Sequence, residues 1–82
     1  MFSKNFSSED DLNYVKMPGI YSVFTAKNAP ENDSENNKIG TLIVNNIWNG
    51  FAICQIYFSV WNGNIFYRSF SSNTWSDWKQ KI

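Results

Sequence analysis

The sequence contains no histidine and only one cysteine, Cys54, among its 82 residues. Without histidine the chain cannot form a Ser-His or Cys-His nucleophile pair, and it has no histidine ligand for a metal. A single cysteine cannot close a disulfide within the chain, and without histidine it has no partner for a zinc cluster. These absences argue against the enzyme classes that need such groups, so we expect no catalytic residue, no metal and no other cofactor.

Net charge and long apolar runs are also lacking. Seven basic and seven acidic residues give a formal net charge of zero, so the basic surface expected of a nucleic-acid-binding protein is missing. No apolar run approaches the roughly 20 residues that span a bilayer, and residues 1–11 lack the apolar region of a signal peptide. We therefore expect no nucleic-acid partner, no membrane insertion and no export by the secretory route.

The short length limits the stability that one copy of the chain can reach. A chain of 82 residues has room for one domain, and the single core of such a domain gives only marginal stability. Small domains are usually supplemented by disulfides, a structural metal or oligomerisation, and the composition leaves only the last of these. Aromatic residues are abundant in contrast, with four Trp, four Tyr and seven Phe. Rings in this number are typical of interfaces and sugar-stacking sites, although a short domain also uses them to fill its core.

The first part of the chain divides into a polar segment and the start of a domain. Residues 1–10 are rich in serine and acidic side chains and are interpreted as an N-terminal arm or linker, with the domain over residues 11–82. Ser8 precedes Asp11 at the spacing of a capping box, which predicts one short helical turn over residues 10–15.

A Pro-Gly pair ends this turn. Pro18 and Gly19 predict a tight turn with the glycine at positive φ, and the β-branched and aromatic residues 20–24 predict the first strand. Residues 25–38 are rich in Asn, Glu, Asp, Ser and Pro and predict a long exposed loop, which is either a binding site or a variable loop. Its alternating acidic residues at 31, 33 and 35 could offer oxygens to a cation, but the EF-hand pattern is absent and a solvated loop is favoured.

Two Asn-Gly dipeptides punctuate the strand-like second half. Asn49-Gly50 and Asn62-Gly63 each stand between apolar runs, and such a dipeptide is the strongest local signal for a hairpin because a type I′ turn needs positive φ at both central residues. They predict a three-stranded meander over residues 41–48, 51–60 and 64–70. The fold class is accordingly β-rich, all-β to α+β: a small antiparallel meander with a short N-terminal helical turn and a Trp-containing C-terminal segment.

Parity decides which side chains share a face of this meander. If both turns have two residues, Trp48 pairs with Phe51 and Trp61 pairs with Asn64. One face is interpreted as the core face and contains Ile43, Asn45, Ile47, Ala52, Cys54, Ile56, Phe58, Val60, Ile65 and Tyr67. Cys54 is accordingly expected to be an inert small hydrophobe.

The other face is nearly as apolar and contains Leu42, Val44, Trp48, Ile53, Gln55, Tyr57, Trp61, Phe66, Arg68 and Phe70. An antiparallel sheet usually keeps one face wet. We therefore expect this second face to be covered by the first strand, by the C-terminal Trp segment or by another copy of the chain.

Two polar side chains on this second face are candidates for a binding site. Unpaired polar groups are costly on an apolar face, so Gln55 and Arg68 need partners. In one interpretation they hydrogen-bond the backbone and each other's surroundings and so lock the fold. In the other they are the polar contacts of a ligand-binding site walled by Tyr57, Trp61 and Phe66, a combination suited to sugars and carboxylates.

The C-terminal segment follows a predicted turn at residues 71–73 and contains Trp75 and Trp78. These two side chains either lie on one side of a helical turn or flank a bend that returns the tail over the sheet. Packing against the sheet is favoured over a carbohydrate-stacking platform.

Short motifs occur in a fixed order along residues 11–79: Asp11-Leu12-Asn13, Pro18-Gly19-Ile20-Tyr21, Asn28-Ala29-Pro30, Gly40-Thr41-Leu42-Ile43-Val44, Gln55-Ile56-Tyr57, Phe66-Tyr67-Arg68 and Thr74-Trp75-Ser76-Asp77-Trp78. In this order the series resembles the pyocin knob domain, which recurs in tail fibres of phages and R-type pyocins. No single motif is specific, and the order carries the resemblance.

The resemblance implies a β-rich module near the C-terminal tip of a homotrimeric fibre, involved in host recognition. It also implies that the matched residues define the fold first: Pro18, Gly19, Tyr21, Gln55, Tyr57, Arg68, Trp75 and Trp78. Tail fibres are long proteins, so the chain corresponds to the knob with a short arm. The sequence leaves open an excised fragment, an internally initiated product and a free-standing accessory subunit.

The resulting hypothesis is a non-enzymatic tip module of a phage tail fibre or tailocin that recognises a host cell-surface polysaccharide, as a homotrimer or within the larger tail fibre protein. Its expected location is the distal tail of the virion or tailocin particle, after synthesis in the host cytoplasm. The alternative is a purely structural knob, a trimerisation unit or an accessory subunit of a receptor-binding protein, without a ligand of its own. A polysaccharide depolymerase would need a carboxylate pair on a scaffold, which the sequence does not predict.

Overall fold

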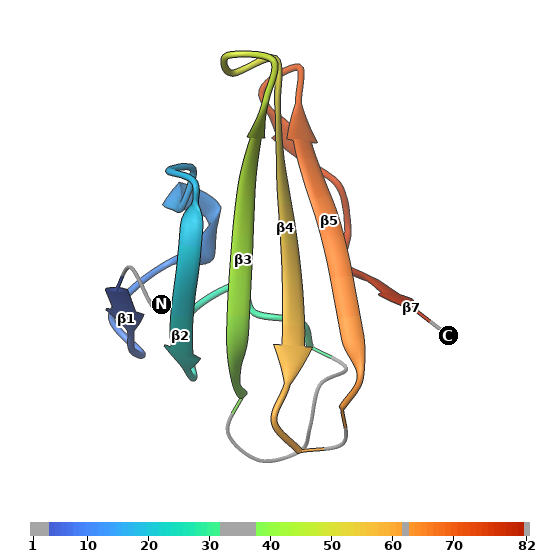
Figure 1. The fold of residues 1–82 in the computed structure, drawn as a ribbon. Coiled ribbons are helices and arrows are strands. Elements are labelled where there is room, and N and C mark those ends of the chain that lie inside the picture. The colour runs from blue at the N-terminus through green and yellow to red at the C-terminus, as the bar shows by residue number, and fades with distance from the viewer. Residues whose placement is uncertain (1–3, 32–37, 62, 82) are drawn as a thin grey trace.

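The computed structural model of the chain describes residues 4–31, 38–61 and 63–81. They form one mixed sheet in the order β1-β2-β3-β4-β5-β6, with β7 also paired to β5 (Figure 1). The strands are β1 (Lys4–Phe6), β2 (Gly19–Phe24), β3 (Ile39–Ile47), β4 (Ala52–Ser59), β5 (Ile65–Ser71), β6 (Thr74–Trp75) and β7 (Lys79–Lys81), and a 3-10 turn, η1, spans Leu12–Tyr14. The described ranges contain no α-helix. The predicted β-rich fold with a short N-terminal helical turn is confirmed.

The N-terminal strand β1 lies beside β2 and is parallel to it, with Lys4 opposite Tyr21 and Phe6 opposite Val23. Phe6 is buried, and its ring centre lies 4.9 Å from that of Tyr21. The sequence assigns residues 1–10 to a polar arm, and for residues 4–6 this is wrong. One buried aromatic side chain anchors the strand, while its two other residues stay exposed as their polar character requires.

The predicted helical turn is confirmed as η1, but its cap is Asp11, whereas the capping-box spacing predicts Ser8. The carboxylate of Asp11 accepts a hydrogen bond of 2.9 Å from the backbone N–H of Asn13 and one of 2.7 Å from the side-chain amide of Asn28. Burial alone would raise the pKa of Asp11, but these hydrogen bonds and the neighbouring positive charges bring the pKa below its ordinary value. The cap therefore favours the ionised carboxylate.

Strand β2 matches the predicted first strand and begins one residue earlier, at Gly19. The positive φ expected at Gly19 is wrong, because the described glycines with positive φ are Gly50 and Gly63. Gly19 instead pairs with Val44 as the first residue of the β2–β3 ladder.

The long exposed loop predicted after β2 is wrong at its start. Ala26, Ala29 and Pro30 are buried, and the backbone of Lys27 exchanges hydrogen bonds of 2.8 and 3.0 Å with the segment that leads into η1. Small side chains let this segment lie close to the sheet, which its polar composition does not reveal. Positions 33 and 35 of the alternating acidic group lie outside the described residues, and Glu31 is exposed.

The first Asn-Gly hairpin has the predicted register. Ile47 pairs with Ala52, and the backbone N–H of Phe51 donates to the carbonyl of Trp48 at 3.2 Å. Asn49 and Gly50 have φ values of 55° and 96°, as a type I′ turn requires.

The second Asn-Gly hairpin has a longer loop than predicted, so the pairing of Trp61 with Asn64 is wrong. Ser59 donates its backbone N–H to Asn64 at 2.9 Å, and Val60 donates instead to Ile39 on the other neighbouring strand. The hydroxyl of Ser59 also accepts a hydrogen bond from the backbone N–H of Trp61 at 3.1 Å, which holds the chain in the turn. The register is displaced by two residues, so each strand residue keeps its predicted face.

The C-terminal segment bends and returns along the sheet, as one of the two predicted alternatives has it. Ser72 and Asn73 form a tight turn at positive φ, and β6 then pairs with the end of β5. Residues 76–78 cross to the other end of β5, where β7 pairs with Ile65, Phe66 and Tyr67.

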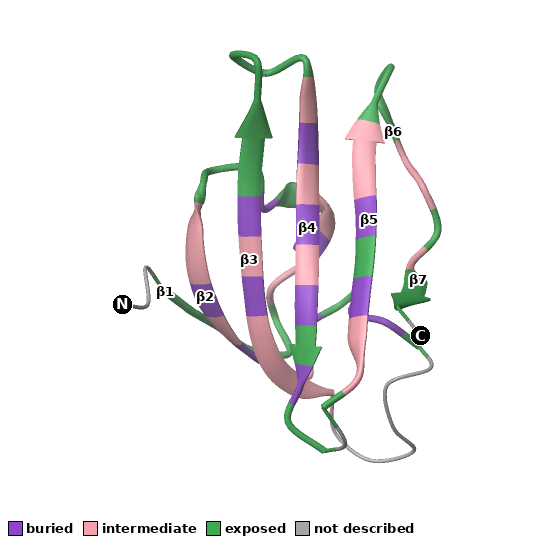
Figure 2. Ribbon diagram, turned by 45° about the vertical axis from the view of Figure 1, so that its right-hand side comes forward, coloured by how far each residue is buried: buried purple, intermediate pink, exposed green. Residues whose placement is uncertain are grey.

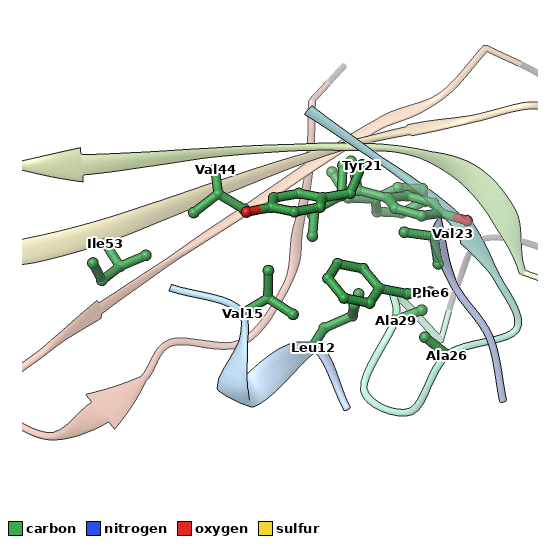
Figure 3. Packing of buried hydrophobic residues seen from close by; sticks show 12 residues of the cluster. Phe6, Leu12, Val15, Tyr21, Val23, Ala26, Ala29, Val44 and Ile53 are labelled. Carbon is green, nitrogen blue, oxygen red and sulfur yellow. The ribbon is translucent and has the colours of Figure 1, made fainter. Parts of the chain in front are cut away.

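The choice of core face is the main correction. Buried residues alternate along β3, β4 and β5 (Figure 2), and they belong to the face that the sequence places second: Leu42, Val44, Ile53, Gln55, Tyr57, Phe66 and Arg68. We call this the inner face. Residues of η1 and the segment 26–30 lie against it (Figure 3), and Trp75 and Trp78 pack against the same core. The expected cover by the C-terminal Trp segment is confirmed, whereas the first strand lies within the sheet.

Candidate functional site

Gln55 is fully buried at the centre of the inner face and has hydrogen-bond partners for both ends of its amide. Its Nε2 donates to the backbone carbonyls of Leu12 at 2.8 Å and Val15 at 2.9 Å, which ties η1 to β4. Its Oε1 accepts a hydrogen bond of 2.9 Å from Nε of Arg68, the residue directly opposite on β5. The side chain therefore links three segments that are far apart in sequence.

Arg68 is 6% exposed and is held by hydrogen bonds and aromatic rings together. Its Nη1 donates to the side-chain oxygen of Asn13 at 2.8 Å, and its Cζ lies 4.1 Å from the ring centre of Trp75 and 4.6 Å from that of Trp78. Within the described chain Nη2 is buried without a hydrogen-bond partner, and cation–π contact with the two indoles offsets part of that cost. Burial lowers the pKa of Arg68 to about 10 although the Asp11 carboxylate raises it, so the guanidinium stays charged at neutral pH.

The two C-terminal tryptophans close this cluster from the far side. The indole N–H of Trp75 donates to the carbonyl of Asn13 at 3.1 Å, and that of Trp78 donates to the carbonyl of Asn28 at 2.7 Å. These bonds connect the C-terminal segment to η1 and to the segment 26–30. We call Asn13, Gln55, Arg68, Trp75 and Trp78 the Arg68 cluster.

Four of the five predicted ligand-binding residues lie together on the inner face. Gln55, Tyr57, Phe66 and Arg68 are all buried there, and Tyr57 has no exposed surface at all. The fifth, Trp61, lies in the loop after β4 and is exposed. In this conformation the first four present no open stacking platform, and Gln55 and Arg68 make the contacts expected of the interpretation in which they lock the fold.

Among the predicted fold-defining positions at the start of β2, Tyr21 makes contacts that hold the fold together. The hydroxyl of Tyr21 donates to the carbonyl of Met17, one residue before the Pro18-Gly19 pair, while its ring is buried against Phe6. Pro18 itself is exposed and precedes the first residue of β2. Tyr21 therefore fixes the connection between η1 and the sheet.

Cys54 lies on the sheet face opposite to the core, and not on the core face as the sequence predicts. It is a free cysteine, half-buried between Asn45 and Ser69 on the neighbouring strands. Among the residues that the structure describes, no three Cys, Asp or Glu side chains come close enough to hold a metal ion.

The most exposed large apolar side chains of the described sheet lie at the tip of the β3–β4 hairpin. Trp48 is 85% exposed and Phe51 is 76% exposed, one on each side of the Asn49-Gly50 turn. The side-chain oxygen of Asn46 accepts a hydrogen bond of 2.6 Å from the backbone N–H of Gly50 and fastens the turn. We call residues 45–51 the hairpin tip.

Backbone strain accompanies this exposure. Trp48 has a φ of 56°, in the left-handed region where a bulky side chain is rare. Such a conformation costs about 1–3 kcal/mol and is concentrated at functional sites. The sequence places Trp48 on a buried face and gives no sign that the tip projects beyond the core.

The face of β2–β5 opposite to the core is the second exposed apolar feature, and we call it the outer face. No strand residue on this face is buried, and the chain segment after β2 that crosses the sheet in Figure 1 passes behind β3 and β4. One row runs directly across four strands through Ile20, Ile43, Ile56 and Tyr67. The sequence interprets most of these residues as the core, and this is wrong because the covering segments lie on the other side.

An open groove of about 800 Å³ lies between β1, η1 and the start of β2. Its lining combines aromatic and apolar side chains with charged ones of both signs, among them Phe6, Tyr14, Met17, Lys16 and Asp10. Tyr14 and Met17 are exposed along it. The sequence assigns no function to these residues, since the fold alone brings the N-terminal segment beside η1.

No helical segment in the described ranges has the length and apolar character needed to cross a membrane. Neither a family model, nor a curated protein, nor a solved structure matches this chain.

Proposed function

We propose that this chain is a non-enzymatic recognition module at the distal tip of a phage tail fibre or tailocin particle, where it binds a host cell-surface polysaccharide as a homotrimer or within the larger tail fibre protein. The order of motifs that resembles the pyocin knob domain supports the context. The exposed hairpin tip supports the binding role, and it is the observation that carries the proposal.

The chemistry of the hairpin tip suits a sugar ligand. Trp48 and Phe51 expose flat apolar rings, the kind of surface that stacks against the apolar face of a sugar ring. Asn45, Asn46 and Asn49 place amides within the same seven residues, and the tip contains no charged side chain. Rings and amides without charge favour a neutral, hydroxyl-rich ligand over an acidic or basic one.

Rigidity and repetition strengthen such a site. The Asn46–Gly50 hydrogen bond and the type I′ turn fix the backbone of the tip before any ligand arrives, which lowers the entropy lost on binding. Each copy offers only a few exposed side chains at the tip, so we expect one copy to bind weakly alone. A particle that displays several copies raises the overall affinity through the effective concentration of the remaining tips.

The experiment measures retention of the chain on a panel of immobilised bacterial surface polysaccharides. We expect the unsubstituted chain to be retained by at least one of them. Trp48→Ala together with Phe51→Ala should weaken that retention by about tenfold or more, because losing an aromatic anchor costs over about 1 kcal/mol.

Tyr14→Ala is the matched control, because Tyr14 is 81% exposed but lies on η1 beside the groove. It should leave retention unchanged. Retention on no polysaccharide would overturn the proposed function. Loss with Tyr14→Ala in place of the tip substitutions would move the site to the groove and overturn the assignment to the tip.

A purely structural knob is the second candidate function. The observation that favours it is the burial of Gln55, Tyr57 and Arg68 in hydrogen bonds and ring contacts that hold the fold together. It predicts that the tip substitutions leave adsorption of the parent particle intact, while substitutions in the Arg68 cluster abolish it through unfolding.

A further inference from the structure

The outer face has a composition that an exposed sheet face rarely has. Its strand residues on β2–β5 are Ile20, Ser22, Phe24, Ile39, Thr41, Ile43, Asn45, Ile47, Ala52, Cys54, Ile56, Phe58, Ile65, Tyr67, Ser69 and Ser71. None of them is charged. The solvated face of an antiparallel sheet is normally polar, whereas the polar side chains among these strand residues are only Ser22, Thr41, Asn45, Ser69 and Ser71.

We propose that the outer face docks a second copy of this chain. The inference rests on the proposed function only in taking the module to work as an oligomer, and it names the surface through which the copies meet. A different protein partner is commonly selected by complementary charge, and the outer face of β2–β5 offers no charge for such selection. Two copies carry no net charge to repel one another, since the formal net charge is zero.

The edges of the sheet support the same arrangement. Lys79 and Lys81 on β7 stand opposite Tyr67 and Ile65, so positive charges border the apolar face along this edge. An apolar centre with a polar rim is the usual anatomy of a protein interface. Lysines on an edge strand also oppose pairing of sheets edge to edge along β7, which favours contact through the face over contact through this edge.

The size of the face sets the expected strength of the contact. Four strands about 4.8 Å apart, with about seven residues at 3.3 Å each, give a projected area of about 450 Å². Two such faces bury about 900 Å², close to the roughly 1,000 Å² that a specific interface needs and well under the standard 1,600 Å². We therefore expect a reversible association that depends on protein concentration.

Sedimentation velocity over a range of micromolar to millimolar concentrations tests the proposal. The chain should pass from monomer to dimer or higher oligomer as its concentration rises. Tyr67→Lys places a charge on β5, at the end of the apolar row that crosses the outer face and at a side chain that is already exposed. Burying that charge in the contact is costly, so the substitution should shift the transition to at least about tenfold higher concentration. Tyr14→Lys makes the same substitution at an exposed tyrosine of η1 and should leave the transition unchanged.

Cys54 supplies a second measurement, because it is the one cysteine of the chain and lies on the outer face. Its alkylation by iodoacetamide should slow as protein concentration rises, and Tyr67→Lys should remove that dependence. A monomer at all concentrations overturns the inference, and so does an oligomer that Tyr67→Lys leaves intact. Polysaccharide retention of the Tyr67→Lys chain on a densely coated surface distinguishes this failure from failure of the proposed function, which depends on the hairpin tip.

Discussion

Replacement of Gln55 by methionine removes the link between η1, β4 and β5 while keeping a side chain of similar length. The substitution leaves the carbonyl of Val15 and Nε of Arg68 without their partners, whereas the carbonyl of Leu12 keeps the backbone N–H of Val15 at 3.2 Å. An orphaned buried group costs about 1–3 kcal/mol, and a charged one lies at the upper end, so we expect a loss of about 3–5 kcal/mol in the free energy of unfolding. Small domains have only about 5–15 kcal/mol in total.

Urea denaturation followed by tryptophan fluorescence measures this loss. Gln80→Met is the matched control, because Gln80 is exposed on β7, and it should change the free energy of unfolding by less than about 0.5 kcal/mol. If the free energy of unfolding of Gln55→Met lies within about 1 kcal/mol of that of the unsubstituted chain, the substitution has not left two buried groups without partners. The role given to Gln55 would then be refuted.

Other substitutions test the register, the cap and the Arg68 cluster. Gly40→Ala would place a Cβ 2.2 Å from the carbonyl oxygen of Phe58, so the free energy of unfolding should fall by about 1–3 kcal/mol and the melting temperature should fall with it. An unchanged melting temperature would contradict this close approach. The folded-state pKa of Asp11 lies below its ordinary 3.8, so the unfolded chain binds more protons as pH falls through and below that value. Stability should therefore decline on acidification there, and Asp11→Asn should show a smaller decline in urea titrations at several pH values. Trp75→Phe removes the indole N–H that donates to the carbonyl of Asn13, so it should lower the free energy of unfolding, measured by urea denaturation, by about 1–2 kcal/mol. Trp48→Phe at the exposed tip should lower it much less.

The sequence predicts the parts of the fold that depend on local chemistry. Asn49-Gly50 specifies its own turn, so the register of the first hairpin and the parity of the strands follow from it. The second dipeptide, Asn62-Gly63, does not specify the length of its loop, because β4 stops pairing with β5 before the dipeptide is reached. Val60 donates its backbone N–H to Ile39 on β3, and the backbone N–H of Trp61 donates to the hydroxyl of Ser59. Loop length there depends on tertiary contacts that a dipeptide does not reveal.

The choice between the two faces could not be made from hydrophobicity, because both are apolar. The decisive clue is the pair of polar side chains on one of them. Gln55 and Arg68 need partners, and the covering segments supply these from Leu12, Asn13 and Val15. Buried polar groups therefore mark the covered face here, as the interpretation in which Gln55 and Arg68 lock the fold implies.

The hairpin tip was the least predictable part of the candidate site. Parity places Trp48 on a face that is buried elsewhere along β3, but the cover ends near Val44, and Asn46 is already exposed. How far a hairpin projects past its cover depends on the lengths of segments packed beneath it, which no local pattern encodes.

The most direct test of the proposed function follows the indole N–H signals of the four tryptophans by NMR while a polysaccharide that retains the chain is added. Trp75 and Trp78 donate their indole N–H groups to backbone carbonyls inside the fold, and Trp48 is exposed at the hairpin tip. We expect the Trp48 signal to shift during the titration while those of Trp75 and Trp78 stay in place. An unchanged Trp48 signal, with shifts confined to the other tryptophans, would contradict this expectation.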